Sequence, residues 1–256
     1  MKIQILGAHN LESANTRPVS LLVDDILALD AGSLTSSLTF EAQQQIKAIL
    51  LTHHHFDHIR DIATIGLAAY SWGKVEVCGS KTTLDALSRY IMNGDVYLNF
   101  TERHPGRGPS REFRPLEPYV AETIQQYQIL AIPVHHAVPA VGYQITAPDG
   151  KRLFYTGDTG PGCSYRREHA SPDLIITEVT MPNMYEDEIR EAGHLSPRLL
   201  GAELLQFQRI KGYLPPVLLV HMNPEVEGQI KVEVEAVARE LGTTITLAYE
   251  GMTIQL

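Results

Sequence analysis

The sequence contains little cysteine and no long apolar run. Its 256 residues include only two cysteines, Cys78 and Cys163, and no Cys-x-x-Cys pair. This excludes a disulfide framework and a thiolate zinc site, and it favours a reducing compartment. No apolar run approaches the roughly 20 residues that span a bilayer, and residues 1–10 become polar too early for a signal peptide. We therefore expect a cytoplasmic protein that makes no contact with a membrane.

Positive charge is also scarce. The chain has 21 Lys and Arg residues against 30 Asp and Glu residues, which gives a formal net charge of −9. An acidic chain lacks the basic surface with which proteins hold long nucleic acids. The composition therefore argues against an extended RNA or DNA partner, while a small phosphorylated ligand held by metal ions is compatible with it.

The hydrophobic content of 44% is sufficient for one large core without disulfide support. The chain contains no linker and no low-complexity segment, so we predict a single domain over residues 1–256. Strands and helices alternate in the hydrophobic pattern. Strands are predicted at residues 2–6, 20–23, 26–29, 48–51, 75–78, 129–134, 142–147, 153–156, 174–177, 217–220, 244–247 and 253–255, the last two as a pair. Helices are predicted at residues 59–70, 82–92, 199–209 and 225–241.

This order of elements predicts an α/β fold with two similar halves. The expected architecture is a four-layer α/β/β/α sandwich, in which two mixed sheets pack face to face and the helices lie outside. Residues 93–115 are rich in glycine and proline. They are predicted to form a loop that serves as a lid or as an oligomer contact.

One segment carries most of the chemical information. The strand predicted at residues 48–51 is followed by Thr-His-His-His-Phe-Asp-His, which places His53, His55, Asp57 and His58 on one strand-to-helix loop. Imidazole and carboxylate groups are suitable ligands for zinc, manganese or iron. Four ligands so close in sequence cannot all reach one ion, so we predict two adjacent ions, one bound by His53 and His55 and the other by Asp57 and His58. The alternative is an exposed histidine tract that binds metal only adventitiously.

These residues match the His-x-His-x-Asp-His motif of the metallo-β-lactamase superfamily at every position, and the chain resembles that superfamily. The resemblance implies a dinuclear metal site. His54 stands at a variable position of the motif and is expected to point away from the metals.

Two ions need further ligands, and His135 and His136 follow a predicted strand. Strand alternation points them to opposite faces without deciding which one faces inward. The resemblance favours His136, because it lies six residues before Gly142-Tyr143, and it leaves His135 as a supporting or core histidine.

Two more candidates follow later strands. Asp158 lies in Thr-Gly-Asp-Thr-Gly, and His221 ends an aliphatic strand. The resemblance implies that Asp158 bridges both ions and that His221 completes the ion bound by Asp57 and His58. An ordinary turn aspartate and a buried core histidine are the alternatives.

The predicted catalytic residues are Asp57 and His194. A histidine near a helix start can protonate a leaving alkoxide or contact a phosphate oxygen, although it can also be a surface or capping residue. Asp30 and Glu178 are interpreted either as carboxylates that orient histidines, as the resemblance implies, or as plain turn residues.

Several residues receive no role in the predicted site. His9, His104 and His169 are interpreted as surface or loop histidines. Cys163 follows the Asp158 loop closely, and a small buried thiol is the preferred interpretation.

Segments 176–183, 193–197 and 220–224 resemble the class II cyclic-nucleotide phosphodiesterases. The chain departs from that family at Ala8-His9-Asn10, where its members carry a Gly-Gly pair, and those members are generally longer. The resemblance implies a hydrolase that uses a metal-bridging hydroxide on a small cyclic nucleotide such as 3′,5′-cyclic AMP.

Two divalent ions, zinc, manganese or iron, are the expected cofactors, and a homodimer is possible. A tRNA 3′ endonuclease is an alternative, but the 21 residues between His136 and Asp158 leave no room for the arm of that branch. An ester, lactone or thioester hydrolase and a non-catalytic binding module are further alternatives.

Overall fold

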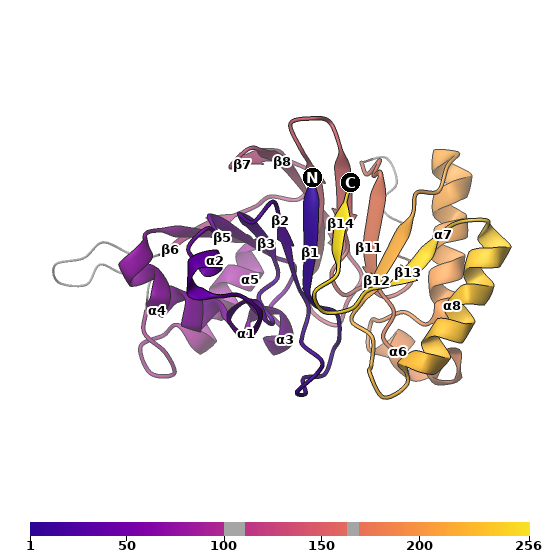
Figure 1. The fold of residues 1–256 in the computed structure, drawn as a ribbon, viewed down its shortest axis with the longest axis horizontal. Helices are drawn as coiled ribbons and strands as arrows, with labels where there is room; N and C mark the ends of the chain where they lie inside the picture. The colour runs from indigo at the N-terminus through magenta and orange to yellow at the C-terminus, as the bar shows by residue number, and fades with distance from the viewer. Residues whose placement is uncertain (100–110, 163–168) are drawn as a thin grey trace.

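The computed structural model describes residues 1–99, 111–162 and 169–256, and it contains two seven-stranded sheets (Figure 1). The first sheet contains β1 (Lys2–Gly7), β2 (Ser20–Val23), β3 (Leu27–Leu29), β4 (Ala48–Leu51), β5 (Val75–Gly79), β6 (Arg111–Pro115) and β14 (Thr253–Gln255). The second contains β7 (Ala121–Ile124), β8 (Tyr127–Val134), β9 (Ala140–Thr146), β10 (Arg152–Tyr155), β11 (Leu174–Glu178), β12 (Val217–Val220) and β13 (Ile245–Leu247). Their orders are β14-β1-β2-β3-β4-β5-β6 and β13-β12-β11-β10-β9-β8-β7.

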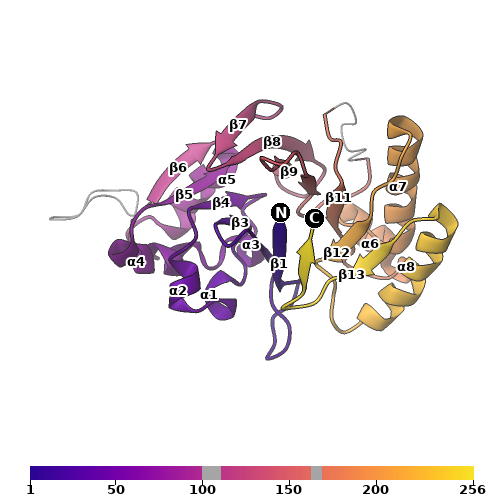
Figure 2. The same cartoon turned by 45° about the horizontal axis from the view of Figure 1, so that its top comes forward.

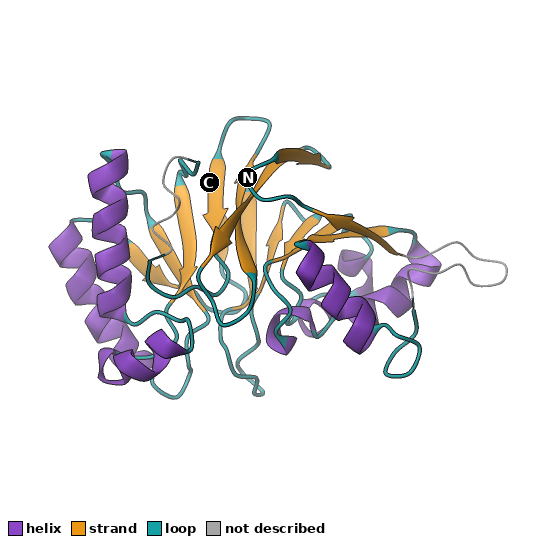
Figure 3. Cartoon of the chain, turned by 180° about the vertical axis from the view of Figure 1, so that it is seen from behind, coloured by secondary structure: helices purple, strands orange, loops and turns teal. Residues whose placement is uncertain are grey.

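Helices lie on the outer side of each sheet, as the view from behind shows (Figure 3). The first sheet is covered by α1 (Leu34–Ser37), α2 (Phe40–Gln43), α3 (Phe56–Ile59), α4 (Ile62–Trp72), α5 (Lys81–Ala86) and the π-helix η1 (Leu87–Ile91). The second is flanked by the 3-10 helix η3 (Asn183–Tyr185), α6 (Glu186–Glu191), α7 (Pro197–Lys211) and α8 (Glu227–Leu241). The predicted α/β/β/α sandwich with two mixed sheets is confirmed.

Apolar side chains fill the space between the sheets and the space beneath the outer helices. Tyr143 and Phe154 of the second sheet belong to the same buried cluster as Leu50 of β4. Ile49 of β4 belongs instead to a cluster with Ile62 of α4. Successive residues of β4 therefore enter different cores, because side chains alternate across a strand, and a strand buried on both faces is apolar throughout.

The end of the chain differs from the prediction. The last two strands do not pair with each other: β13 runs parallel to β12, whereas β14 crosses to the first sheet and pairs antiparallel with β1. Figure 2 shows β1 and β14 side by side between the two groups of helices. Proximity in sequence favoured a local pair, but the open edge of β1 is the partner that β14 uses.

Three predicted segments need smaller corrections. The helix expected at residues 59–70 is divided into α3 and α4, and the helix expected at residues 82–92 changes from α5 to the π-helix η1. Of the loop predicted at residues 93–115, residues 100–110 lie outside the described part. Arg111–Pro115 forms β6, which pairs in parallel with β5. Proline at the end of an edge strand is tolerated, so the composition of this segment concealed a strand.

The strand directions bring the functional loops to one edge of the sandwich. In the first sheet β3, β4 and β5 run parallel, and in the second β10, β11 and β12 run parallel. Since β9 is antiparallel to both β8 and β10, β8 runs in the direction of β10. The carboxyl ends of strands that run in one direction meet at the same edge of a sheet, and open α/β sheets bind ligands there. In the described ranges, no helix is long and apolar enough to cross a membrane.

Candidate dinuclear metal centre

The loop after β4 and the short helix α3 carry four of the predicted ligands. His53 is fully buried directly beyond the strand, and His58 is fully buried inside α3. His55 precedes α3, and Asp57 lies in its first turn. The change from strand to helix within a few residues turns all four side chains toward the second sheet.

The second sheet contributes three residues that follow strands. His136 comes after β8, Asp158 after β10 and His221 after β12. Together with the first-sheet residues they form two groups of potential metal ligands, within each of which the ligand atoms lie within 4.8 Å of one another. The first group consists of His53, His55, His136 and Asp158, and the second of Asp57, His58, Asp158 and His221.

Asp158 is the residue that both groups share. Its Oδ1 lies 3.2 Å from His58 Nε2, and its Oδ2 lies 3.3 Å from His221 Nε2 and 3.7 Å from His53 Nε2. A carboxylate in this position can place one oxygen in each group, which is the arrangement that a bridging ligand requires. The structure therefore brings together all seven predicted ligands, keeps the predicted division of His53 and His55 from Asp57 and His58, and places His136 with the first pair.

Several atoms at the centre of these groups are buried without a hydrogen-bond partner. They are His53 Nε2, His58 Nε2 and Asp158 Oδ1. Leaving a buried polar atom unpaired costs free energy, so such a cluster is expected only where something else satisfies it. Imidazole nitrogens and carboxylate oxygens are the donor set of zinc and related divalent ions. The side chains therefore fit a dinuclear metal site.

The opposite nitrogen of each buried histidine is already engaged by the protein. His58 Nδ1 donates to Asp30 Oδ2 over 2.8 Å, and His136 Nδ1 donates to the Gly193 carbonyl over 2.9 Å. His53 Nδ1 and His221 Nδ1 lie 3.0 and 2.9 Å from the hydroxyls of their threonine neighbours Thr52 and Thr180. These contacts orient Nε2 toward the site, as ligating histidines usually require.

Asp30 supports the ligands of the first sheet. It follows β3, is fully buried and has a left-handed φ of 55°. Besides His58 it accepts hydrogen bonds from the Thr52 hydroxyl and from the Tyr155 hydroxyl, the latter over 2.6 Å. Tyr155 belongs to the second sheet, so Asp30 also connects the two sheets. Tyr155 was not singled out by the sequence, although its place at the end of a strand near Asp158 was a usable signal.

Glu178 has the corresponding place in the second sheet. It is fully buried at the end of β11 and accepts hydrogen bonds from the Thr180 hydroxyl over 2.6 Å and from His194 Nδ1 over 2.7 Å. Burial opposes the charge of His194, but the Glu178 carboxylate outweighs it and raises the pKa of His194 to about 9. Its ring stacks on that of His221 with centroids 5.2 Å apart. His194 thus lies beside the ligands and belongs to neither of the two groups, although it forms a third possible group with Glu178 and His221.

Two glycines allow the loops to approach closely. Gly157 has a φ of 61°, and a Cβ there would lie 2.7 Å from the Thr52 side chain. Gly193 has a φ of 79°, and a Cβ there would lie 2.9 Å from the His136 backbone. A larger residue at Gly157 would push Asp158 away from the loop that carries His53.

The site is closed on one side and open on the other. The side chains of His53, His58 and Asp158 are at most 3% exposed, whereas that of Asp57 is 32% exposed. His55 is also partly exposed. For Asp57, burial raises the pKa, but the hydrogen bond from His221 and the nearby imidazoles prevail and lower it to about 2, so this carboxylate is ionised.

The remaining histidines are placed as follows. His135 is exposed and turned to the Pro161 carbonyl, so His136 is the member of the pair that reaches the cluster. His54 lines a separate cavity of about 280 Å³ with residues of α5 and η1. His169 is exposed beside Tyr119. His104 and Cys163 lie outside the described residues.

His9, interpreted as a surface or loop residue, does lie in the loop beyond β1, but it is not on the surface. His9 is only 4% exposed, and its ring lies between two carboxylates, with Nδ1 2.7 Å from Glu250 Oε1 and Nε2 3.2 Å from Glu227 Oε2. It also forms a bridge with Met222, next to His221. The partners of His9 lie more than 200 positions away, so no local pattern could have revealed them.

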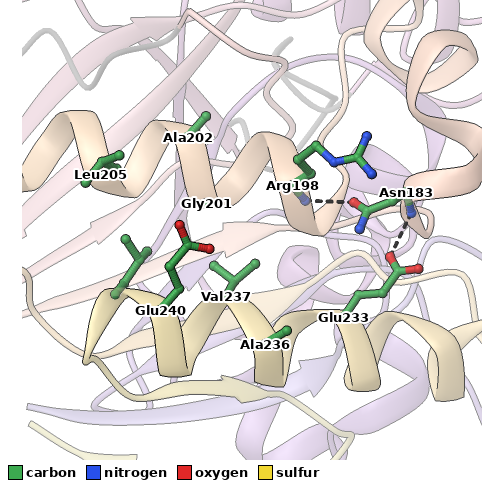
Figure 4. Close-up of a pocket in the computed structure, with 10 residues that line it drawn as sticks. Asn183, Arg198, Gly201, Ala202, Leu205, Glu233, Ala236, Val237 and Glu240 are labelled. Atoms are coloured by element: carbon green, nitrogen blue, oxygen red, sulfur yellow. Dashed lines mark hydrogen bonds between the residues drawn. The ribbon is translucent and has the colours of Figure 1, made fainter.

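A cavity of about 420 Å³ between α7 and α8 contains none of these groups (Figure 4). Small residues such as Gly201 and Ala236 leave this gap, and Arg198, Glu233 and Glu240 surround it. The candidate chemistry is concentrated at the strand ends and not in this outer groove.

Comparison with known families agrees with this arrangement. A family described as "Beta-lactamase superfamily domain" matches residues 22–222, which include the ligand loop and His221. The chain belongs to the metallo-β-lactamase superfamily. Membership implies divalent metal ions and hydrolase chemistry at the two groups. Comparison of the sequence with curated proteins finds no match.

Solved structures of this superfamily have the same fold. Unliganded yeast PDE1 is 18% identical, with a TM-score of 0.84 over 100% of this chain and 99% of that one. The metallo-β-lactamase fold protein YhfI from Bacillus subtilis is 20% identical, with a TM-score of 0.78 over 99% and 98%. The short form of human tRNase Z is 18% identical, with a TM-score of 0.69 over 100% and 99%. At these identities the likeness concerns the fold.

Proposed function

We propose that this protein is a dinuclear metal-dependent phosphodiesterase that opens a small cyclic nucleotide of the 3′,5′-cyclic AMP type. The observation that carries the proposal is His194, an imidazole held by Glu178 directly beside both ligand groups. Cleavage of a phosphodiester releases an alkoxide, and an alkoxide needs a proton. An acid placed beside the ions supplies it.

The ligand groups define where each ion is held. His53, His55 and His136 would hold one ion, Asp57, His58 and His221 would hold the other, and Asp158 belongs to both groups. Two divalent ions supply a water of lowered pKa and positive charge for the phosphate oxygens. The expected ions are zinc, manganese or iron, since this donor set accepts all three.

The chain's own residues handle the protons of the reaction. Water gives up one proton to solvent as its oxygen bonds to phosphorus, and the bond between phosphorus and the 3′ oxygen breaks; solvent later reprotonates His194. His194, whose Nδ1 is fixed by Glu178, has Nε2 available to give its proton to that leaving oxygen. Asp57 is ionised and partly exposed, so it is placed to accept a hydrogen bond from the attacking water, which is its proposed catalytic role.

A tRNA 3′ endonuclease activity is less well supported. The strands β9 and β10, which separate His136 from Asp158, are joined by a tight turn at Pro148-Asp149-Gly150. The net charge of −9 also disfavours a long polyanion. We therefore propose a small phosphodiester as the substrate of a cytoplasmic enzyme, which a homodimer would equally accommodate. An ester, lactone or thioester substrate remains the competing chemistry on the same ligand groups.

The test measures metal content and substrate range together. Purified protein is loaded with zinc or manganese and assayed with bis(p-nitrophenyl) phosphate, 3′,5′-cyclic AMP, a precursor tRNA and a panel of esters, lactones and thioesters. About two metals per chain and opening of cyclic AMP are expected. Asp158→Ala should lose both metal binding and activity, whereas Asp149→Ala, in the exposed turn, should lose neither. Two bound metals with cleavage of esters alone would overturn the phosphodiesterase proposal.

A further inference from the structure

Phe56 stands at the open side of the ligand cluster. It is the residue between His55 and Asp57, which belong to different ligand groups. Both neighbours are partly exposed, whereas His53, His58 and Asp158 are buried and the side chain of His136 is 0% exposed. A substrate that reaches the centre must therefore come in on the side where His55, Phe56 and Asp57 lie.

The side chain of Phe56 is left uncovered by the fold. It is 63% exposed at the first position of α3, in contrast to the buried Ile59 at the end of the same helix. Single exposed apolar residues are common on protein surfaces, so exposure alone indicates nothing. What distinguishes Phe56 is its fixed position, because both of its neighbours are held by the contacts of the ligand cluster.

Phe40 provides the comparison within the same chain. It is 66% exposed and is also the first residue of a four-residue helix, α2. No member of the ligand groups adjoins Phe40, which lies between Thr39 and Glu41. The two phenylalanines therefore match in exposure and local structure, and they differ in that only Phe56 lies between two predicted metal ligands.

We propose that Phe56 is a specificity-determining residue whose ring packs against a planar ring of the substrate, the base of a nucleotide, next to the scissile phosphodiester. This inference rests on the proposed function for the identity of that ring as a base. Base-on-aromatic stacking strengthens binding by about tenfold or more. It requires no particular base, since every base has a flat face, so Phe56 selects for a ring and not for its hydrogen-bonding pattern.

The test compares ligands that differ by one planar ring. Dissociation constants are measured by calorimetry on metal-loaded protein for 5′-AMP against ribose 5-phosphate and for phenyl phosphate against methyl phosphate. Phe56→Ala should weaken the ring-bearing member of each pair by about tenfold and leave the other unchanged. Phe56→Tyr should retain the preference, and Phe40→Ala should behave as the wild type.

Three results would overturn the inference: equal weakening of both members of a pair, no weakening of either, or loss of bound metal from Phe56→Ala. The same measurements separate it from the proposed function. If cyclic AMP is not hydrolysed but Phe56→Ala abolishes the preference for phenyl phosphate, the role of Phe56 stands and the cyclic nucleotide is wrong. If cyclic AMP is hydrolysed and Phe56→Ala still prefers the ring-bearing ligands, the proposed function stands and the role of Phe56 is wrong.

Discussion

Asp30 and Glu178 hold histidines in the two halves of the molecule in nearly the same way. Each is a fully buried carboxylate at or just beyond the end of a strand, one in each sheet. Each accepts a hydrogen bond from a threonine hydroxyl, Thr52 in the first half and Thr180 in the second. Each threonine in turn contacts Nδ1 of a predicted metal ligand.

The two halves differ in the histidine that each carboxylate binds directly. Asp30 binds His58, which is fully buried and faces Asp158, whereas Glu178 binds His194, whose side chain is 17% exposed. Both carboxylates raise the pKa of their histidine, so the halves differ in what lies beside the ring: His58 lies against Asp158, whereas the His194 side chain is partly exposed. What a buried carboxylate does for a histidine depends on what the second nitrogen faces, so the pairing alone does not identify a metal ligand.

The largest effect, on kcat, is expected from replacing His194 in the second half. His194→Gln should lower kcat by about 10²–10⁴-fold while both metals remain bound, because it removes an acid and not a ligand. In the proposed mechanism His194 acts in its protonated form, and Glu178 raises its pKa to about 9, so wild-type activity should fall as the pH rises through that value. Glu178→Gln should shift this alkaline limb to lower pH, which a pH profile of kcat measures.

Loss of one metal from His194→Gln would contradict this assignment and make His194 a ligand in the third group, with Glu178 and His221. The matched control is His135→Gln, which changes an exposed histidine that faces away from the cluster.

A smaller effect, on metal affinity, is expected from replacing Asp30 in the first half. Asp30→Asn should weaken metal binding by about 10- to 100-fold, because both His58 and, through Thr52, His53 depend on this carboxylate. Titration with a competing chelator measures the affinity. Glu178→Gln should weaken it less, since Glu178 reaches His221 only through Thr180. Its bond from the Thr159 N–H, next to Asp158, can still be accepted by the glutamine oxygen. Equal losses of affinity in the two variants would remove the distinction between the halves.

The smallest effect is expected from replacing His9, whose contacts with Glu227 and Glu250 join the two halves near His221. Burial lowers the pKa of His9, but the hydrogen bonds and charges of Glu250 and Glu227 prevail and raise it above the ordinary 6.5. The stabilisation is therefore fully present below about pH 6.5 and is lost as the pH rises through the folded-state pKa. His9→Gln should lower the free energy of unfolding by about 1–3 kcal/mol near pH 5.5 and by less near pH 9.

Urea denaturation of metal-loaded protein at both pH values measures this difference. Burial raises the pKa of Glu250, but the hydrogen bonds from His9 and from the backbone N–H groups of Arg17 and Glu250 together lower it. The contribution of Glu250 is therefore lost in acid, below the range of the test. An identical loss at both pH values would show that His9 acts by packing alone.

The sequence predicted the ligands of the first half better than the contacts that orient them. His53, His55, Asp57 and His58 lie within one run of six residues, so one motif contained their predicted chemistry and its division between two ions. His136 could not be separated from His135 by alternation, because β8 ends at Val134 and the rule stops with the strand.

Long-range contacts explain the other errors. The burial of His9 is decided by Glu227 and Glu250, and the place of β14 by the free edge of β1, each more than 200 residues away. Local propensities contain no information about such partners. Strand positions, in contrast, follow from local apolar runs, and the two-sheet architecture followed from their order.

The composition of the two ligand groups has a consequence for how the molecule is held together. Each group takes residues from both sheets: the first joins His53 and His55 to His136, and the second joins Asp57 and His58 to His221. Any ion bound there is a crosslink between sheets whose ligands are scattered in the unfolded chain. Binding of the ion therefore adds to the free energy that holds the two sheets together, so metal supply affects the stability of the chain as well as its activity.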